Sequence, residues 1–466
     1  MSLPAPMAFS DLDRGGIAGH PRGLTTLFFT ELWERFSYYG MRALLILFMT
    51  APLAAGGLGL EVKKAAAIYG LYTFGVYFMA IPGGIAADLL LGARRAVLWG
   101  GILIALGHFS LALGLLPFFY AGLVLIVTGT GLLKPNISVM VGHLYAPGDN
   151  RRDAGFSLFY MGINLGGLVS PIVCGFLGQQ VAWRLGFGAA GVGMTLGLAQ
   201  YLLGRDRLGA AGLRAGLGVA ISKGRSGAVA SGRPDGPAPI GRVTNALRGP
   251  WFTAGEWKRI AAIAVLFVFS AVFWAAFEQA GSSFNLFADR RTRDSILGWN
   301  FPSSWFQSVG PLWVLLLAPA FAWLWVRLGR REPSSPAKFS YGLFFVGVGP
   351  LLLAAASSLS GGATDRVSPA WLILVYLAQT IGELCLSPVG LSTVTKLAPP
   401  PIVGLMMGVW FLSLALGNYI GGWVAGYFEI LPLARLYGAL FLATGLSALV
   451  LAFLSRPIRK LMGGVH

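Results

Sequence analysis

Long apolar segments separated by short polar ones dominate the hydropathy pattern of this chain. Twelve of these segments are long enough to cross a hydrocarbon layer of roughly 30 Å as helices, namely 24–50, 65–86, 94–116, 118–142, 155–180, 183–203, 258–287, 303–327, 338–358, 368–395, 402–427 and 430–454. Six precede a stretch rich in Gly, Ser, Pro and Arg, and six follow it. The pattern predicts an all-α integral membrane protein. Its expected parts are an N-terminal tail (1–23), a first bundle (24–203), a linker (204–257), a second bundle (258–454) and a C-terminal tail (455–466).

Composition favours a membrane protein over a soluble one. Hydrophobic residues make up 56% of the 466 residues, charged residues 11%, and the mean hydropathy is +0.70, whereas soluble domains carry about 25% charged residues. The net charge of +17 could suggest nucleic acid, but most basic residues lie between the apolar segments, and no zinc-finger, helix-turn-helix or RNA-binding signature accompanies them. We therefore expect a surrounding lipid bilayer and no nucleic-acid partner.

The distribution of basic residues predicts the orientation. With a cytoplasmic N-terminus, 24 of the 35 Lys and Arg residues lie on the cytoplasmic side, eight lie outside and three lie within spans. Because cytoplasmic loops carry the excess of basic residues, both termini and the linker are expected in the cytoplasm. The first twenty residues lack the apolar core of a signal peptide, so the first span is expected to direct insertion. The expected location is the inner membrane of a bacterial-type cell.

The first span carries a charged stripe. At 100° per residue, Glu31, Arg35, Tyr38 and Arg42 fall within about 60° of one another, and Glu34 lies about 60° to one side. The stripe extends over roughly 16 Å of helix rise, so its charges lie too deep to reach the membrane surface. It therefore predicts a polar cavity inside the bundle.

Seven ionisable residues lie within the predicted spans, and they are the candidates for the chemistry: Glu31, Glu34, Arg35, Arg42, Lys134, Glu278 and Glu383. Facing lipid, they would together cost on the order of 20 kcal/mol, so they are expected to face one another or water. Four acids against three bases leave one carboxylate in excess, which suits a transported proton. A carboxylate that loses and regains its basic partner could bind that proton on one side of the membrane and release it on the other. The alternative for each residue is a static ion pair that holds helices together.

The two halves resemble diverged copies. Glu34-Arg35-Phe36 in the first span has a counterpart in Phe277-Glu278-Gln279, and the Asn164 segment resembles the segment that begins at Asn418. Pro135 and Pro388 are expected to interrupt the fourth and tenth spans. Parallel six-helix repeats with a central linker are typical of the major facilitator arrangement, in which two pseudo-symmetric bundles rock about a midplane site.

Several motifs together resemble one family. The first-span sequence Glu31-x-x-Glu34-Arg35-Phe36-x-Tyr38-Tyr39-Gly40 resembles the first-helix signature of the proton-dependent oligopeptide transporters, a branch of the major facilitator superfamily. Further similar motifs are Gly83-Gly84-Ile-Ala-Ala-Asp88, Gly131-Leu-Leu-Lys134-Pro135-Asn136, Phe159-Tyr160-x-x-Ile163-Asn164, Phe273-Trp274 through Glu278-Gln279, Gly382-Glu383-Leu-Cys-Leu-Ser-Pro388 and Gly408-Val-Trp410-Phe411. The resemblance extends from residue 24 to about residue 425.

The resemblance implies symport of di- and tripeptides with protons by alternating access. It implies that the peptide carboxylate contacts Arg35 and Lys134, and that the amino terminus contacts Glu383. Asn164 with Tyr38 or Tyr39 would then bind the peptide backbone, and Tyr77 and Trp410 would line side-chain pockets. By the same resemblance, Arg42 and Glu278 form the extracellular gate, and Glu31, Glu34, Arg35 and Glu278 couple the proton. Two positions depart from the family pattern: Gly310 replaces the usual Asn, and Leu89 replaces the usual Arg.

The remaining expectations concern other ligands and other functions. Cys174 and Cys385 lie in apolar segments, so neither a disulfide nor a metal site is expected, and no cofactor is expected beyond the coupling proton. We expect a monomer. One alternative is a major facilitator transporter of another solute, such as nitrate or a drug. Another is a receptor or a membrane enzyme, although no span carries a Ser/His/Asp, Cys/His or metal-spaced cluster.

Overall fold

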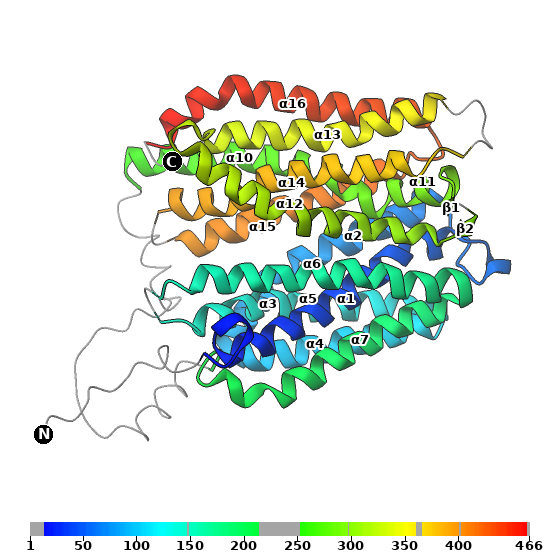
Figure 1. Cartoon of the computed structure of the whole chain (residues 1–466), viewed down its shortest axis with the longest axis horizontal. Helices are drawn as coiled ribbons and strands as arrows, with labels where there is room; N and C mark the ends of the chain where they lie inside the picture. Colours follow the sequence, from blue (N-terminus) through cyan, green and yellow to red (C-terminus); the bar gives the residue numbers. More distant parts are fainter. Residues whose placement is uncertain are drawn as a thin grey trace, which may run out of the picture.

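The computed structural model describes residues 14–146, 149–213, 252–296, 298–359, 366–399 and 402–463. Helices dominate these residues and run side by side along one common direction (Figure 1). Most of the predicted linker, residues 214–251, lies outside the described residues, as does most of the N-terminal tail. The helix α1 begins and α16 ends on the same side of the molecule (Figure 1).

The helices match the predicted spans to within a few residues. The first half contains α1 (Arg22–Thr50), α2 (Val62–Phe78), α3 (Ala80–Ala86), α4 (Ala93–Ala112), α5 (Leu116–His143), α6 (Arg152–Phe176) and α7 (Trp183–Leu203). Shorter turns in this half are η1 (Ile17–Gly19), η2 (Leu53–Ala55), η3 (Ala87–Leu91), η4 (Leu177–Val181) and η5 (Arg205–Leu208).

The second half contains α10 (Ala254–Phe277), α11 (Ser283–Arg291), α12 (Val309–Leu328), α13 (Ser335–Leu359), α14 (Ala370–Leu397), α15 (Val403–Ala425) and α16 (Leu433–Leu461). Its turns are η6 (Glu278–Gly281), η7 (Ser303–Ser308) and η8 (Gly329–Arg331), and β1 (Ser295–Ile296) pairs with β2 (Trp299–Asn300) in a small antiparallel hairpin. In the described residues, eleven helical stretches are long and apolar enough to cross a membrane. The charged helix α1 is a twelfth, so the prediction of twelve long helices is confirmed.

One predicted span contains a turn, and one predicted detail is wrong. The span expected at 258–287 lies within the apolar stretch Ala254–Arg291, in which the 3₁₀ turn η6 at Glu278–Gly281 separates α10 from α11. Conversely, α5 runs through Pro135 and α14 through Pro388 without ending. Helices within a membrane tolerate proline when neighbouring groups satisfy the freed backbone atoms.

The polarity of the molecule is reversed relative to a soluble protein. Large apolar side chains such as Leu203 (82% exposed) and Phe453 (83% exposed) point outward, whereas the charged Glu34 is fully buried. An apolar exterior around buried charges is the arrangement that a lipid bilayer stabilises. The helical surface thus supports the predicted membrane location.

The two halves form separate groups of helices that meet along one interface. In Figure 1 the helices α1 and α3 to α7 lie together below, and α10 to α16 lie together above. The most extensive contact between the groups joins α2 to α15. There Gly70 faces Gly422, and a Cβ atom added to Gly70 would lie 2.9 Å from the Cα atom of Gly422. Small residues of this kind allow two helix backbones to approach closely within a membrane.

We expect Gly70→Leu to hold the two halves apart where α2 meets α15, because the new side chain cannot fit against Gly422. The measurement is the distance between spin labels at Lys64 and Ile430, which are both exposed. The native cysteines Cys174 and Cys385 are buried, so they should not compete for the label. The control is Gly438→Leu, since a Cβ atom there meets open space. A distance distribution that is the same in Gly70→Leu and in the control would contradict the expectation.

Candidate functional site

Three residues of the charged stripe of α1, Glu31, Glu34 and Arg35, form a compact buried cluster. The Nε atom of Arg35 lies 3.1 Å from Oε1 of Glu31 and also pairs with Glu34, and all three residues are at most 3% exposed. The pairing with Glu31 follows from their i, i+4 spacing, which places them on one helix face. One guanidinium therefore serves two carboxylates, so the cluster carries one negative charge in excess when both are ionised.

This cluster leaves several polar atoms without a hydrogen-bond partner in the part of the chain that the structure describes. They are Oε2 of Glu31, Oε1 of Glu34 and Nη2 of Arg35. A buried charged group with unsatisfied atoms is costly. The cluster therefore has free positions for a proton, a water molecule or a charged ligand.

Lys134 brings a second basic group to the same region. Its Nζ atom lies 4.0 Å from the centre of the Tyr77 ring, so α5 contacts α2 through a cation–π interaction. The ammonium is also within electrostatic reach of Glu31, Glu34 and Glu278. Lys134 can thus balance the excess negative charge next to Arg35.

A cavity of about 1200 Å³ lies between α6 of the first half and α12 and α14 of the second. Asn164 and Tyr160 line it on one side, and Leu384, the neighbour of Glu383, lines it on the other. The Asn164 amide donates to the Tyr160 carbonyl at 3.0 Å, while Glu383 is within electrostatic reach of Tyr39 and Tyr160. Because Lys396 and Arg459 also line the cavity, it extends toward the side where α16 ends. A cavity of this size accommodates a small-molecule ligand.

Two predicted aromatic residues lie in packed surroundings. Trp410 is 2% exposed and packs edge-on against Phe339, with its ring over Gly390. Tyr38 is 2% exposed, and Arg35 lies over its ring with Cζ 5.2 Å from the ring centre. Trp410 is therefore part of the second half's apolar core in this conformation, and its role in a side-chain pocket stays a prediction.

The two departures from the family pattern lie in different places. Gly310 accepts a hydrogen bond from the Thr380 hydroxyl through its backbone carbonyl at 3.5 Å, and a Cβ atom there would lie 3.7 Å from the Tyr376 ring. Leu89 lies in η3 and is 45% exposed. A side chain at position 310 would therefore lie between α12 and α14, in contact with Tyr376.

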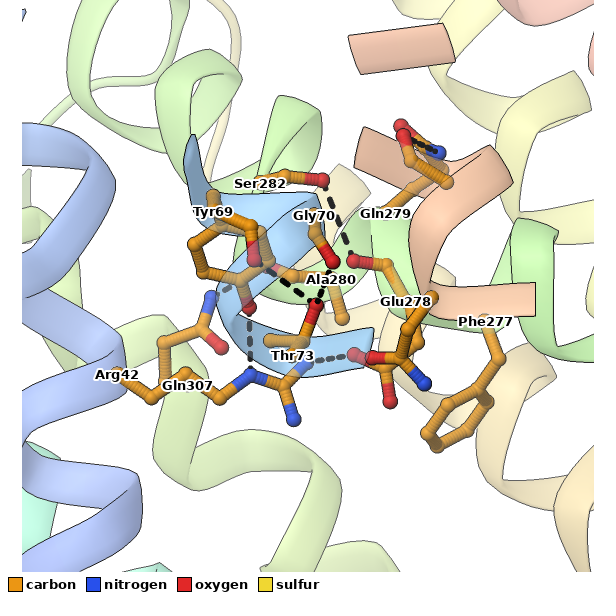
Figure 2. A network of polar contacts seen from close by, with 12 residues as sticks. Arg42, Tyr69, Gly70, Thr73, Phe277, Glu278, Gln279, Ala280, Ser282 and Gln307 are labelled. Carbon is orange, nitrogen blue, oxygen red and sulfur yellow. Dashed lines mark hydrogen bonds and ion pairs between the residues drawn. The ribbon is translucent and has the colours of Figure 1, made fainter. Parts of the chain in front are cut away.

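Arg42 and Glu278 form a buried ion pair that joins the two halves (Figure 2). The Nε atom of Arg42 also donates to the Tyr69 hydroxyl at 2.6 Å, and Thr73 donates to the Tyr69 carbonyl at 2.9 Å. The turn η6 begins at Glu278, and a Cβ atom added to Gly281 would lie 2.7 Å from Nε of Arg42. Three elements, α1, α2 and η6, therefore meet at one guanidinium.

Neutral polar residues, which the sequence analysis missed, add further contacts between the halves. The Asn285 amide donates to the Ala43 carbonyl at 2.8 Å. The Gln179 amide donates to the Ser303 hydroxyl at 2.8 Å and accepts from the Ser304 backbone at 3.0 Å. The Ser308 hydroxyl donates to the Leu168 carbonyl at 2.7 Å. These contacts close the side where α1 ends, opposite the side toward which the cavity extends.

We expect Glu278→Gln to weaken this closure, because the buried Arg42 charge would lose its ionised partner. Removing one partner of a buried ion pair costs about 3–5 kcal/mol in other proteins. Hydrogen–deuterium exchange should therefore become faster in α11 and η7, whose residues carry the neighbouring contacts. The matched control is Glu429→Gln, which removes the partner of Arg290 from a pair in which Glu429 is 50% exposed. Unchanged protection in Glu278→Gln, or an equal change in the control, would contradict this role.

Comparison with known proteins agrees with these features. The model of the POT family matches residues 94–212 and 253–438. The chain is 44% identical to the uncharacterized transporter YclF of Bacillus subtilis, over 97% of this chain and 96% of that protein. It is 40% identical to the peptide transporter YePEPT of Yersinia enterocolitica, over 96% of each.

Solved structures of POT transporters have the same fold. A peptide transporter POT in complex with sulfate is 41% identical and superimposes with a TM-score of 0.86, covering 97% of this chain and 98% of that one. A POT family transporter in complex with 5-aminolevulinic acid is 34% identical with a TM-score of 0.85, covering 97% and 100%. The predicted fold is confirmed, and the relatives are transporters rather than enzymes. The protein is therefore a member of the POT family of membrane transporters.

Proposed function

We propose that this transporter imports di- and tripeptides together with protons by alternating access. The observation that carries the proposal is the placement of opposite buried charges in the two halves, with a cavity between these halves. Arg35 and Lys134 belong to the first half and Glu383 to the second, and the cavity of about 1200 Å³ lies between α6 and α14. The relative named as a peptide transporter supports a peptide as the ligand.

A peptide zwitterion matches this distribution of charge. Its carboxylate would contact Arg35, whose planar guanidinium can form two parallel hydrogen bonds, and Lys134, which acts as a point charge. Its amino terminus would contact Glu383, and the amide of Asn164 would bind its backbone. Because all peptides share these groups, the site would accept varied side chains, with Tyr77 and Trp410 lining the side-chain pockets.

Transport would be coupled to protons because Glu31, Glu34 and the peptide carboxylate compete for the guanidinium of Arg35. In the present conformation Glu31 and Glu34 both engage Arg35. Protonation of either carboxylate would weaken its hold on Arg35 and leave donors for the peptide carboxylate. Peptide binding and proton binding would thus favour each other, as thermodynamic linkage requires.

The Arg42–Glu278 pair would act as the gate on the side where α1 ends. Protonation of Glu278 would release Arg42 and allow the halves to separate there, so the cavity would open to the other side of the membrane. With both termini in the cytoplasm, as the basic residues predict, this gate would face outward and the present cavity inward. We propose that the transporter lies in the inner membrane in this orientation, where a proton gradient directed into the cell would drive inward transport.

The test is uptake of labelled dialanine by the purified transporter in liposomes. Uptake should rise when an inward proton gradient is imposed and collapse when a protonophore is added. Unlabelled di- and tripeptides should compete, whereas nitrate should not. Uptake that is indifferent to the gradient would reject proton coupling, and failure of unlabelled dialanine to compete would favour transport of another solute on the same scaffold.

A further inference from the structure

A second cavity, of about 470 Å³, lies where η3, α4, α7 and η5 meet, away from the central cavity. Three arginines line it: Arg94 and Arg95 at the start of α4, and Arg205 at the start of η5. Leucines from the same elements form the rest of its wall, among them Leu90, Leu98 and Leu202. None of the functional residues discussed above lines this cavity, so peptide transport leaves it unexplained.

The cavity is held in shape by Arg94. Its guanidinium donates from Nε to the Ala211 carbonyl and from Nη2 to the Gly209 carbonyl, both at 2.6 Å. Its own carbonyl accepts a hydrogen bond from the Tyr201 hydroxyl at 3.0 Å. These bonds tie the segment after η5 to α4 and α7, so the basic wall does not depend on a bound ligand for its shape.

The charges at the cavity favour an anion. Arg95 and Arg205 are exposed, and neither side chain forms an ion pair within the described residues. Asp206, which is within electrostatic reach of Arg94, supplies one opposing charge. The positive end of the α4 dipole also lies here, where the Arg94 backbone amide donates to the Gly212 carbonyl at 3.1 Å. The site therefore carries a net positive charge.

The apolar part of the wall restricts the kind of anion. Leu90 is 70% exposed and Leu202 is 46% exposed, so leucine side chains flank the arginines on the outer surface of the bundle. A free phosphate ion would contact only the arginines. A molecule that carries both a phosphate group and a hydrocarbon chain would contact both kinds of wall, and anionic phospholipids are such molecules.

We propose that this cavity binds the phosphate group of an anionic phospholipid, with an acyl chain along Leu90, Leu98 and Leu202. Arginine forms paired hydrogen bonds with phosphate oxygens, and basic residues at a membrane surface attract anionic lipids. The cavity lies at the ends of helices that face lipid, on the side where α1 begins, so a lipid headgroup can reach it from the bilayer.

The test is native mass spectrometry of the purified full-length transporter with phosphatidylglycerol or with phosphatidylcholine of the same acyl chains. The wild-type protein should bind at least one phosphatidylglycerol tightly and prefer it to phosphatidylcholine. The variant Arg95→Gln/Arg205→Gln should bind phosphatidylglycerol about twenty-fivefold more weakly, at roughly fivefold for each arginine. Arg94 is kept, because it has structural hydrogen bonds.

The matched control is Arg207→Gln/Arg152→Gln, which removes two exposed arginines from the same half without touching the cavity lining. Thermal unfolding checks that each variant folds. If the double variant does not fold, Arg205→Gln alone replaces it and is expected to weaken binding about fivefold. Equal loss in the control, or equal binding of the two lipids to the wild type, would overturn the proposal. Displacement of the lipid by millimolar glycerol phosphate would show that the site takes a soluble phosphate, and would overturn the lipid assignment.

Discussion

Replacing Glu31 with glutamine should abolish the accumulation of dipeptide against its gradient, while exchange of labelled for unlabelled peptide continues. Exchange needs only binding and rocking of the two halves, whereas accumulation needs the net release of a proton. One proton moving through 100 mV releases about 2.3 kcal/mol, enough for about fiftyfold accumulation. The expected result is therefore a fall from about fiftyfold accumulation to none, measured in liposomes with an imposed membrane potential of 100 mV.

Glu34→Gln should likewise abolish accumulation while exchange continues, because Glu31 and Glu34 both pair with the guanidinium of Arg35. The control is Glu61→Gln, since this carboxylate is exposed and lies before α2, away from the cluster. Retained accumulation in both Glu31→Gln and Glu34→Gln would show that these carboxylates hold helices together rather than carry the proton.

Lys134→Ala and Glu383→Ala should each weaken dipeptide binding by about tenfold to a hundredfold. Hydrogen bonds to charged groups contribute about 1.5–3 kcal/mol, and each variant removes one group that is proposed to bind a peptide terminus. The measurement is the concentration of dialanine that half-saturates exchange. Lys63→Ala and Glu61→Ala are the controls, because both side chains are exposed outside the cavity.

Peptides with one chemically blocked terminus test separately which residue binds the amino terminus and which binds the carboxylate. Wild-type transporter should discriminate against dialanine with an acetylated amino terminus, and Glu383→Ala should lose that discrimination. Likewise, Lys134→Ala should lose part of the discrimination against an amidated carboxyl terminus, while Arg35 retains the rest. If both variants bind dialanine with unchanged affinity, the assignment of the termini is wrong.

The sequence predicted those parts of the site that depend on helix periodicity and on the cost of a charge in lipid. The i, i+4 spacing of Glu31 and Arg35 places them on one face of α1, where the structure shows their ion pair. Periodicity did not predict that Arg35 also pairs with its neighbour Glu34, because adjacent residues point about 100° apart. The contact forms because the Arg side chain is long enough to reach back.

Contacts between helices that are far apart in the sequence could be predicted only where they involve a charged residue. Asn285 and Gln179 join the two halves, but a neutral amide within a span gives no signal in a count of charges. Tyr69 likewise lies in an aromatic-rich helix, where nothing distinguishes it from a packing residue. The close contact of Gly281 in η6 with Arg42 and Tyr69 also joins residues that are remote in sequence, so helix periodicity could not predict it.

We propose that peptide and proton move together through the charged cluster of α1. The most direct measurement is the pH inside liposomes that contain the purified transporter, followed with a trapped dye when dialanine is added outside and no proton gradient is imposed. Entry of dialanine should acidify the interior with wild-type protein, and Glu31→Gln should abolish the acidification. Dialanine uptake by the wild-type protein without any acidification would contradict proton-coupled transport.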